Sequence, residues 1–260
     1  MARKRHSRLL KWGGYSFGLM LILFIGPLLS LLSCTTNLNG HWSSANRKST
    51  KLAPSPETNA EAVVQVYAAR AYKWRGLFAV HMWIATKPEA SSHYTIYQVL
   101  GWRSRWGGTV IDSFRGVPDR YWFGNKPDLI VDVQGAQAAR IIPQIEKAIA
   151  SYPYANYYRI WPGPNSNTFI AHVGREVPEL GIAMPANAIG KDYLPGDRWI
   201  ALMPSGTGYH LSLFGLLGVG IAVKEGLEFN LLGLTFGIDV LRPALKLPGI
   251  GRLGLDRHPG

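Results

Sequence analysis

The sequence predicts an α+β domain in which an antiparallel sheet carries two main helices. Three observations lead to this fold class. Short runs rich in β-branched and aromatic residues follow one another between residues 77 and 133, with Gly, Pro and Asp between them. Two stretches, 135–150 and 166–175, repeat apolar residues at helical spacing. After residue 206 the chain becomes apolar and glycine-rich, which favours additional strands at the C-terminus.

The composition and the absence of common motifs exclude several classes of site and enzyme. The chain has 260 residues, of which 47% are hydrophobic, so it is long enough to bury a core. Its single cysteine excludes an intramolecular disulfide framework, a four-cysteine zinc site and a CxxC redox pair. The signatures GxxxxGK[ST], HExxH and GxSxG do not occur in the sequence. We therefore expect no cofactor and no metal site.

The N-terminus is typical of an export signal or a membrane anchor. Basic residues without any acidic residue occupy the first 12 positions, and residues 15–33 contain no charge. This apolar run of about 19 residues is roughly the minimum for one bilayer span. A basic segment before such a run stays on the cytoplasmic side while the following chain crosses the membrane. We expect residues 1–34 to be a signal peptide or transmembrane helix in contact with the lipid bilayer.

The only cysteine, Cys34, ends the apolar run within Leu-Leu-Ser-Cys. This stretch resembles the bacterial lipoprotein box, in which the cysteine is lipidated and becomes the new N-terminus. The alternative is a free cysteine at the end of an uncleaved anchor helix. Both interpretations place residues 35–260 in the cell envelope, on the extracytoplasmic side of the cell membrane.

The net charge of +12 falls to +7 when residues 1–33, with five basic and no acidic residues, are left out. Much of the positive charge therefore belongs to targeting, and we expect no nucleic-acid partner. The remaining excess suits a location near anionic lipid or an envelope polymer.

The exported part begins with a polar segment. Residues 35–60 are rich in Ser, Thr, Asn and Pro without an apolar period, so we interpret them as a linker before a single domain at 61–260. An apolar stripe predicts a short helix at 60–70. Strands are expected at 77–84, 94–100, 110–114, 121–123 and 129–133.

Two helices should follow these strands. In the segment 135–150, isoleucines recur every four residues, and Pro143 should bend or split the helix. In the segment 166–175, Asn165 can cap the N-terminus and Pro178 can stop the helix. The C-terminal runs 211–223 and 227–240 are then expected to be two glycine-containing strands, with a membrane-hugging hairpin as the alternative.

Three polar residues suggest a site. His81 lies within the apolar strand segment Phe-Ala-Val-His-Met-Trp-Ile, where a buried imidazole needs a hydrogen-bond partner. His93 begins the next strand, and a hairpin would bring the two strands side by side. Ser166 lies at a helix N-terminus, where backbone N–H groups favour a developing anion. The alternative role of Ser166 and Asn165 is helix capping alone.

A histidine in a strand, a polar residue on the next strand and an Asn-nucleophile-x-x-Phe helix start resemble circularly permuted papain-like domains. These include the NlpC-type and lecithin–retinol acyltransferase-like groups, and the resemblance covers about residues 75–180. It implies Ser166 as nucleophile, His81 as base and His93 as the residue that orients His81. Serine stands where those groups usually have cysteine, so its hydroxyl must give its proton to a neutral histidine during attack.

Across roughly residues 60–254 the chain also resembles a bacterial, membrane-associated family of unknown function. Three stretches carry this resemblance: Gly-Pro-Asn-Ser-Asn-Thr-Phe at 163–169, Pro-Ser-Gly-Thr-Gly-Tyr at 204–209, and the segment 241–253. The resemblance implies membrane association and supplies no activity.

Two functions follow from these observations. The first is a membrane-tethered hydrolase or acyltransferase that acts on an amide or ester of an envelope polymer or lipid. In that case Asn165, Asn167 and Trp83 are assigned to substrate binding. The second is a non-catalytic envelope protein that binds or scaffolds on the same fold. The distance between Ser166 and the His81 ring discriminates between them.

Overall fold

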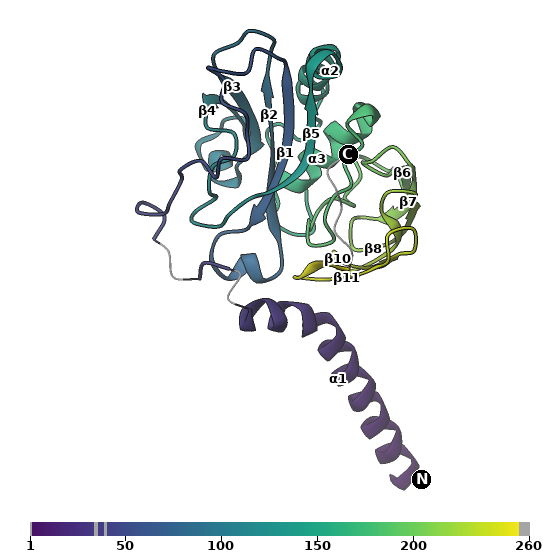
Figure 1. Ribbon diagram of the computed structural model, residues 1–260. Helices are drawn as coiled ribbons and strands as arrows, with labels where there is room; N and C mark the ends of the chain where they lie inside the picture. Colours follow the sequence, from purple (N-terminus) through teal and green to yellow (C-terminus); the bar gives the residue numbers. More distant parts are fainter. Residues whose placement is uncertain (1, 34–35, 39–40, 255–260) are drawn as a thin grey trace.

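A long N-terminal helix and two antiparallel sheets make up the computed structural model, which describes residues 2–33, 36–38 and 41–254 (Figure 1). Helix α1 (Ala2–Leu32) leaves the domain at one end. Judged by hydropathy, none of the helices in these ranges is apolar over a length sufficient to cross a membrane. Cys34 lies outside the described residues.

The first sheet has five strands in the order β4-β3-β2-β1-β5, and all neighbours are antiparallel. Its strands are β1 (Val63–Arg70), β2 (Val80–Lys87), β3 (Tyr94–Val99), β4 (Ile111–Gly116) and β5 (Asp128–Gln134). The α+β class is thereby confirmed, whereas the helix expected at 60–70 is wrong. That segment is β1, whose two faces are both buried, so its apolar run imitated a helical stripe. Residues 121–123 form only an isolated bridge, Trp122 to Asn125.

Two helices cover one face of this sheet. Helix α2 (Gly135–Ala150) packs on β1 and β5, and helix α3 (Ser166–Glu176) packs on β2. Pro143 neither splits nor ends α2. It lies on the exposed side of the helix, and so does Ala139, whose carbonyl loses its usual helical partner because proline has no N–H group.

The alternation of side chains along the strands produces two cores. Val80, Met82 and Ile84 of β2 point toward the helices and pack with residues such as Ile145 and Phe169. The intervening residues point to the other face, where Trp83, Tyr67 and Ile96 form a second cluster.

Part of the segment expected to be a linker covers this second face. Leu52 and Ala53 pack against the cluster around Trp83. Asp119 Oδ2 accepts hydrogen bonds from Ser49 Oγ at 2.9 Å and from Leu52 N at 2.7 Å, which holds the segment in place.

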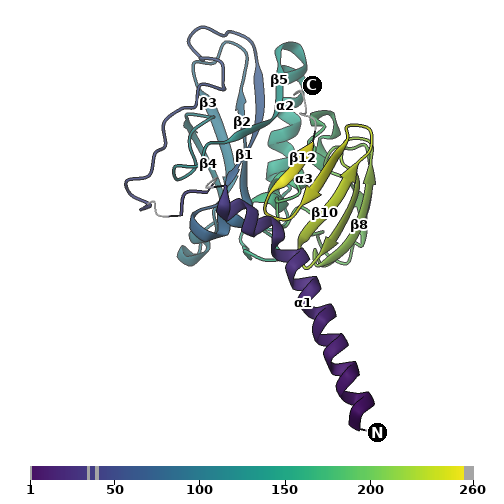
Figure 2. The same ribbon diagram turned by 60° about the horizontal axis from the view of Figure 1, so that its bottom comes forward.

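The second sheet is a seven-stranded meander in the order β12-β11-β10-β9-β8-β7-β6. Its strands are β6 (Ile200–Leu202), β7 (Gly208–Leu213), β8 (Leu217–Ala222), β9 (Gly226–Leu231), β10 (Leu234–Asp239), β11 (Ala244–Leu247) and β12 (Gly251–Gly254). The two strands expected at 211–223 and 227–240 are in fact two hairpins. Both turn at a pair with positive φ, Phe214-Gly215 in the three-residue loop between β7 and β8 and Leu232-Gly233 in the two-residue loop between β9 and β10. Positive φ at these positions suits the twist of tight hairpin turns. Helix α3 lies between the two sheets (Figure 2).

Candidate functional site

The N-terminus of α3 is held rigidly by its cap. Asn165 Oδ1 accepts hydrogen bonds from the backbone N–H groups of Asn167 and Thr168, at 2.9 and 3.3 Å. Thr168 Oγ1 in turn accepts from Asn165 N at 3.1 Å, which completes a capping box. Asn165 Nδ2 also donates to the Ile189 carbonyl at 3.0 Å. The cap therefore fixes the first helical residue, Ser166, against the neighbouring loop.

Asn167 ties this helix start to the sheet. Its Nδ2 donates to the carbonyl oxygens of Val80, at 3.0 Å, and Ile189, at 2.8 Å. Val80 begins β2, so the contact brings Ser166 close to the strand that carries His81. In the described residues, Asn167 Oδ1 is buried without a hydrogen-bond partner.

His81 is held by a polar network on the opposite face of β2. Its Nε2 lies 3.2 Å from Gln98 Oε1, which also accepts from Arg120 Nη2 at 3.1 Å. Gln98 Nε2 donates to Asp112 Oδ2 at 2.9 Å, and this bond fixes the orientation of the amide. The Gln98 oxygen is thus the acceptor, which assigns the proton of His81 to Nε2.

The environment keeps the His81 imidazole neutral. The ring stacks on Trp122, with the centroids 3.8 Å apart and the planes 10° apart. Burial lowers the pKa of His81 to about 3, and the positive charge of Arg120 acts in the same direction, while the Gln98 hydrogen bond opposes them. A base this weak is far from the value near the operating pH that suits proton transfer.

Ser166 and His81 border one large cavity of about 1130 Å³. It opens at the end of the five-stranded sheet where β2 begins, next to the α3 N-terminus. Aromatic and aliphatic side chains form most of its wall: Trp42, Tyr72, Trp74, Phe78, Leu100, Trp102, Trp122, Phe123, Tyr158, Ile160, Trp161, Ile189, Leu232 and Leu234. Its charged lining residues are Arg47, Arg75 and Arg105, and no carboxylate of the described residues lines it.

The three residues of the expected catalytic group, Ser166, His81 and His93, do not come together in the cavity. His81 pairs across the sheet with Ala69 and shares the face of Trp83, whereas α3 packs on the face of Val80 and Met82. Within the described ranges, no hydrogen bond joins Ser166 to His81. Strand alternation therefore separates the two side chains although their backbones are close.

His93 does not take the place expected for it. The register pairs Thr86 with Thr95 and Ile84 with Tyr97, so His93 lies at the turn end of the β2–β3 hairpin, opposite to the end that carries His81. The partner of His81 is Gln98, five residues further along the chain. An antiparallel pairing places the first residue after a turn beside the last residue before it, and this geometry favoured Gln98 over His93.

Trp83 does not line the cavity. It is fully buried, stacks on Tyr67 at 5.5 Å, and donates from Nε1 to the Pro118 carbonyl at 2.7 Å. Asn165, Asn167 and Ser166 do line the cavity. The tryptophans that line the cavity are Trp42, Trp74, Trp102, Trp122 and Trp161.

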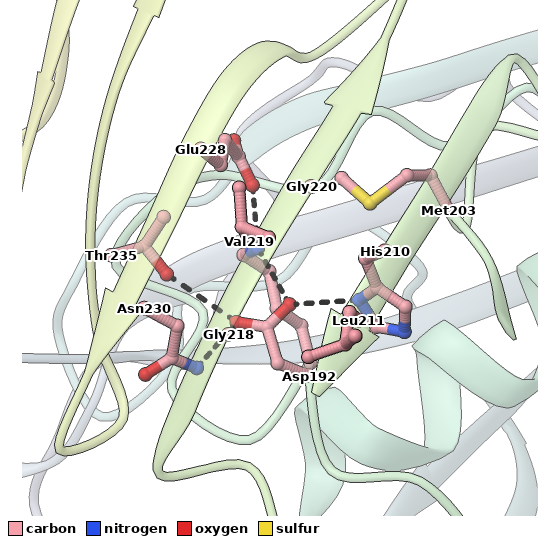
Figure 3. Close-up of a pocket in the computed structure, with 11 residues that line it drawn as sticks. Asp192, Met203, His210, Leu211, Gly218, Val219, Gly220, Glu228, Asn230 and Thr235 are labelled. Atoms are coloured by element: carbon pink, nitrogen blue, oxygen red, sulfur yellow. Dashed lines mark hydrogen bonds and ion pairs between the residues drawn. The ribbon is translucent and has the colours of Figure 1, made fainter. Parts of the chain in front are cut away.

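A second polar cluster lies beneath the seven-stranded sheet and was not expected. Lys191 Nζ lies 2.7 Å from Glu228 Oε2 and 3.0 Å from Asp192 Oδ1, and Lys246 pairs with the other oxygen of Glu228. Asp192 also accepts from Asn230 Nδ2 at 2.8 Å and contacts His210 (Figure 3). Burial lowers the pKa of Lys191, but the two carboxylates outweigh it and hold the pKa above its usual value.

This cluster has the geometry of a structural ion network. The cavity beside it is only about 10 Å³, roughly the space of one water molecule. In the described chain, no group of histidine, cysteine and carboxylate side chains has an arrangement that would hold a metal ion. The cluster therefore neutralises buried charge and leaves no room for an organic ligand.

Comparison with known proteins gives one result. Residues 61–193 match a family described as a protein of unknown function (DUF3750). This match covers just over half of the chain, from β1 through α3 to the segment that carries Lys191, and ends before the seven-stranded sheet. No curated protein and no solved structure matches the chain. The chain belongs to the DUF3750 family.

Proposed function

We propose that the chain is a membrane-tethered envelope protein that binds an acyl-chain amphiphile with an anionic head group. The observation that carries this proposal is the large cavity with its aromatic wall. Pockets for organic ligands are mostly apolar with a few placed polar groups, and this one adds three arginines without a carboxylate. Guanidinium groups suit phosphate and carboxylate head groups, while the rings suit an acyl chain.

The proposed tether is α1, with Cys34 as a lipidation site if the signal is cleaved there. The C-terminal end of α1 adjoins the cavity, since the Phe24 ring packs edge-on against Phe78, which lines it, at 5.8 Å. A ligand site beside the anchor has direct access to envelope lipids. Cys34→Ser should abolish incorporation of labelled fatty acid. Equal labelling of the wild-type protein and the variant would contradict lipidation at Cys34.

Binding without catalysis is favoured by the surroundings of Ser166. A serine nucleophile needs a base within hydrogen-bond reach, and the candidate base His81 faces the other side of β2 with a strongly lowered pKa. We propose that the domain is a circularly permuted papain-like fold in which the catalytic chemistry is absent. The order of a histidine strand followed by an Asn-Ser helix start supports this relationship.

Hydrolysis or acyl transfer at Ser166 is the second candidate. It is favoured by the position of this side chain at a helix N-terminus on the cavity wall, where a developing anion is stabilised. Labelling with a fluorophosphonate probe separates the two functions. Binding alone predicts no labelling, whereas Ser166-dependent labelling that Ser166→Ala removes would establish the enzyme.

The experiment that tests binding uses the full chain purified from membranes, with extraction and mass spectrometry of the lipids that remain bound. Ala79→Trp places an indole on the cavity wall and should lower the retained amphiphile several-fold. Ala139→Trp, on the exposed side of α2, is the matched control and should retain the wild-type amount. Equal retention in both variants would mean that lipid surrounds α1 only, and would overturn the proposal.

The three arginines give a second readout. Arg75→Gln combined with Arg105→Gln should shift the retained lipids from anionic to zwitterionic species, because the positive charge on the cavity wall is lowered. An unchanged lipid composition would contradict the assignment of the head-group site.

A further inference from the structure

The seven-stranded sheet has its polar side inward and its apolar side outward. Side chains that face the ion network are buried and polar, among them His210, Ser212, Glu228, Asn230, Thr235 and Lys246. Side chains that face away are apolar and exposed: Tyr209, Leu211, Leu217, Val219, Ile221, Phe229, Ile238, Leu245 and Leu253. The exposed fraction is 68% for Ile221 and 52% for Phe229.

The register makes these outward side chains one continuous surface, called here the outer face. Tyr209 pairs with Ile221, Leu211 pairs with Val219, and Val219 pairs with Phe229. The rows therefore continue across β7, β8 and β9. A contiguous exposed apolar patch marks a contact with a membrane, another protein or a ligand, whereas single scattered apolar side chains do not.

Within the strands of this sheet and the turns between them, the exposed charges are of one sign. From residue 199 to residue 254 the acidic residues Glu225, Glu228 and Asp239 are all buried. The exposed charged residues of the same stretch, Lys224 and Arg242, are both basic. The surface thus combines apolar rows with exposed positive charge, which is complementary to an anionic lipid surface.

The outer face adjoins α1. Gly26 and Pro27 pack against the turn between β11 and β12, at Pro248 and Gly249, so closely that a side chain at position 26 would collide with the Pro248 carbonyl. Both views show α1 leaving the domain beside this sheet (Figures 1 and 2). The same helix exposes Ile22, Ile25 and Leu28 among other apolar side chains.

We propose that the outer face lies on the surface of an anionic lipid bilayer as a second membrane contact. The inference rests on the membrane tether proposed for α1 and not on the ligand of the cavity. A bilayer fits better than a second copy of the chain, because an isologous dimer would bring the exposed basic residues of both copies to one interface. The inward ion network also fits, since it removes the sheet's polar side chains from the face that meets lipid.

The test places an environment-sensitive NBD dye on the outer face of the full chain. In a Cys34→Ser background, Ile221→Cys and Phe229→Cys each provide one labelling site, and Glu89→Cys in the exposed β2–β3 turn provides the control. The proteins are reconstituted into phosphatidylcholine–phosphatidylglycerol vesicles with and without brominated lipid. The dye at positions 221 and 229 should shift its emission to the blue and be quenched by bromine, and the dye at 89 should do neither.

The outcomes separate the two proposals. If none of the labelled proteins floats with the vesicles, the tether itself is wrong. If all float but the dye at 221 stays in an aqueous environment, the outer face does not contact lipid and this inference is overturned. A blue shift at 221 that depends on protein concentration and is not quenched by bromine would assign the face to a second copy instead. Lys224→Glu with Arg242→Glu should reduce the quenching at 221, which supports the charge complementarity.

Discussion

The two sheets bury opposite kinds of side chain. The five-stranded sheet has apolar clusters on both faces, around Met82 on one side and Trp83 on the other. The seven-stranded sheet buries an ion network and exposes its apolar rows. The first sheet is stabilised by removal of apolar surface from water, whereas the second depends on the pairing of charges in its interior. The same strand alternation therefore produces a core in one case and an apolar surface in the other.

The largest effect on the second sheet is expected from removal of Glu228, the acid that Lys191 and Lys246 share. Glu228→Gln takes away the carboxylate that pairs with Lys246 and one of the two that pair with Lys191, so buried positive charge remains uncompensated. We expect a loss of about 3–5 kcal/mol in the free energy of unfolding, measured by urea titration. Glu179→Gln removes an exposed ion pair with Arg140 and should cost less than about 1 kcal/mol. Similar losses in both variants would contradict a network that stabilises the sheet.

Truncation of one isoleucine in each half of the domain should show how differently the two sheets depend on apolar burial. Ile145 on α2 is fully buried, and Ile221 on β8 is mostly exposed. Ile145→Ala should lower the free energy of unfolding by about 2–5 kcal/mol through lost burial and a cavity. Ile221→Ala should change it by less than about 0.5 kcal/mol in the absence of lipid. Equal losses in urea titration would show that the outer face is covered in the isolated protein.

The pH dependence of stability tests the first sheet alone. The pKa of His81 is lowered from 6.5 to about 3, chiefly by burial. The unfolded chain then binds a proton below about pH 6.5 that the folded chain does not bind, so stability is present above this pH and is lost as the pH falls toward about 3. Between about pH 7.5 and about pH 5.5 this loss is on the order of 1 kcal/mol. His81→Gln should show a shallower loss over the same range, and an identical profile would exclude this origin.

The last prediction concerns the helix start beside the cavity. Asn165→Ala removes the cap of α3 and should cost about 1–2 kcal/mol, because two backbone N–H groups lose their acceptor. Ser166→Ala should cost less, since its side chain does not cap the helix. Thermal unfolding of the two variants measures the difference, and a larger effect of Ser166→Ala would point to a structural role for its hydroxyl.

Much of the fold could be predicted because local signals were strong. The period of the isoleucines located α2, and the Asn-Ser-Asn-Thr stretch located the cap of α3. Segment β1 was misassigned because a strand buried on both faces shows no alternation. The hairpins of the second sheet were merged because Phe214 and Leu232 are bulky residues at positive φ, which turn rules assign to glycine or asparagine.

The arrangement of the candidate site could be predicted only in part. Alternation placed His81 on the same face as Trp83, but the sequence did not indicate on which face the helices pack. The presence of a hairpin was predicted, whereas its register depends on the turn length, and this decided between His93 and Gln98. The cavity wall combines residues from position 42 to position 234, so it emerges only from the tertiary structure.

The meander of the second sheet has a consequence for the order of folding. Each of its strands pairs with the next in the chain, so hairpins can form from local contacts at little cost in loop entropy. The ion network is different, because Lys191 and Asp192 come from outside the sheet. Arg175 of α3 donates hydrogen bonds to the carbonyl oxygens of Lys191 and Leu202 beside the network. The hairpins can therefore form early with a hydrated inner side, and that side loses its water only when the 191–192 segment and α3 dock. For this half of the chain, docking therefore closes a charged interior rather than an apolar one.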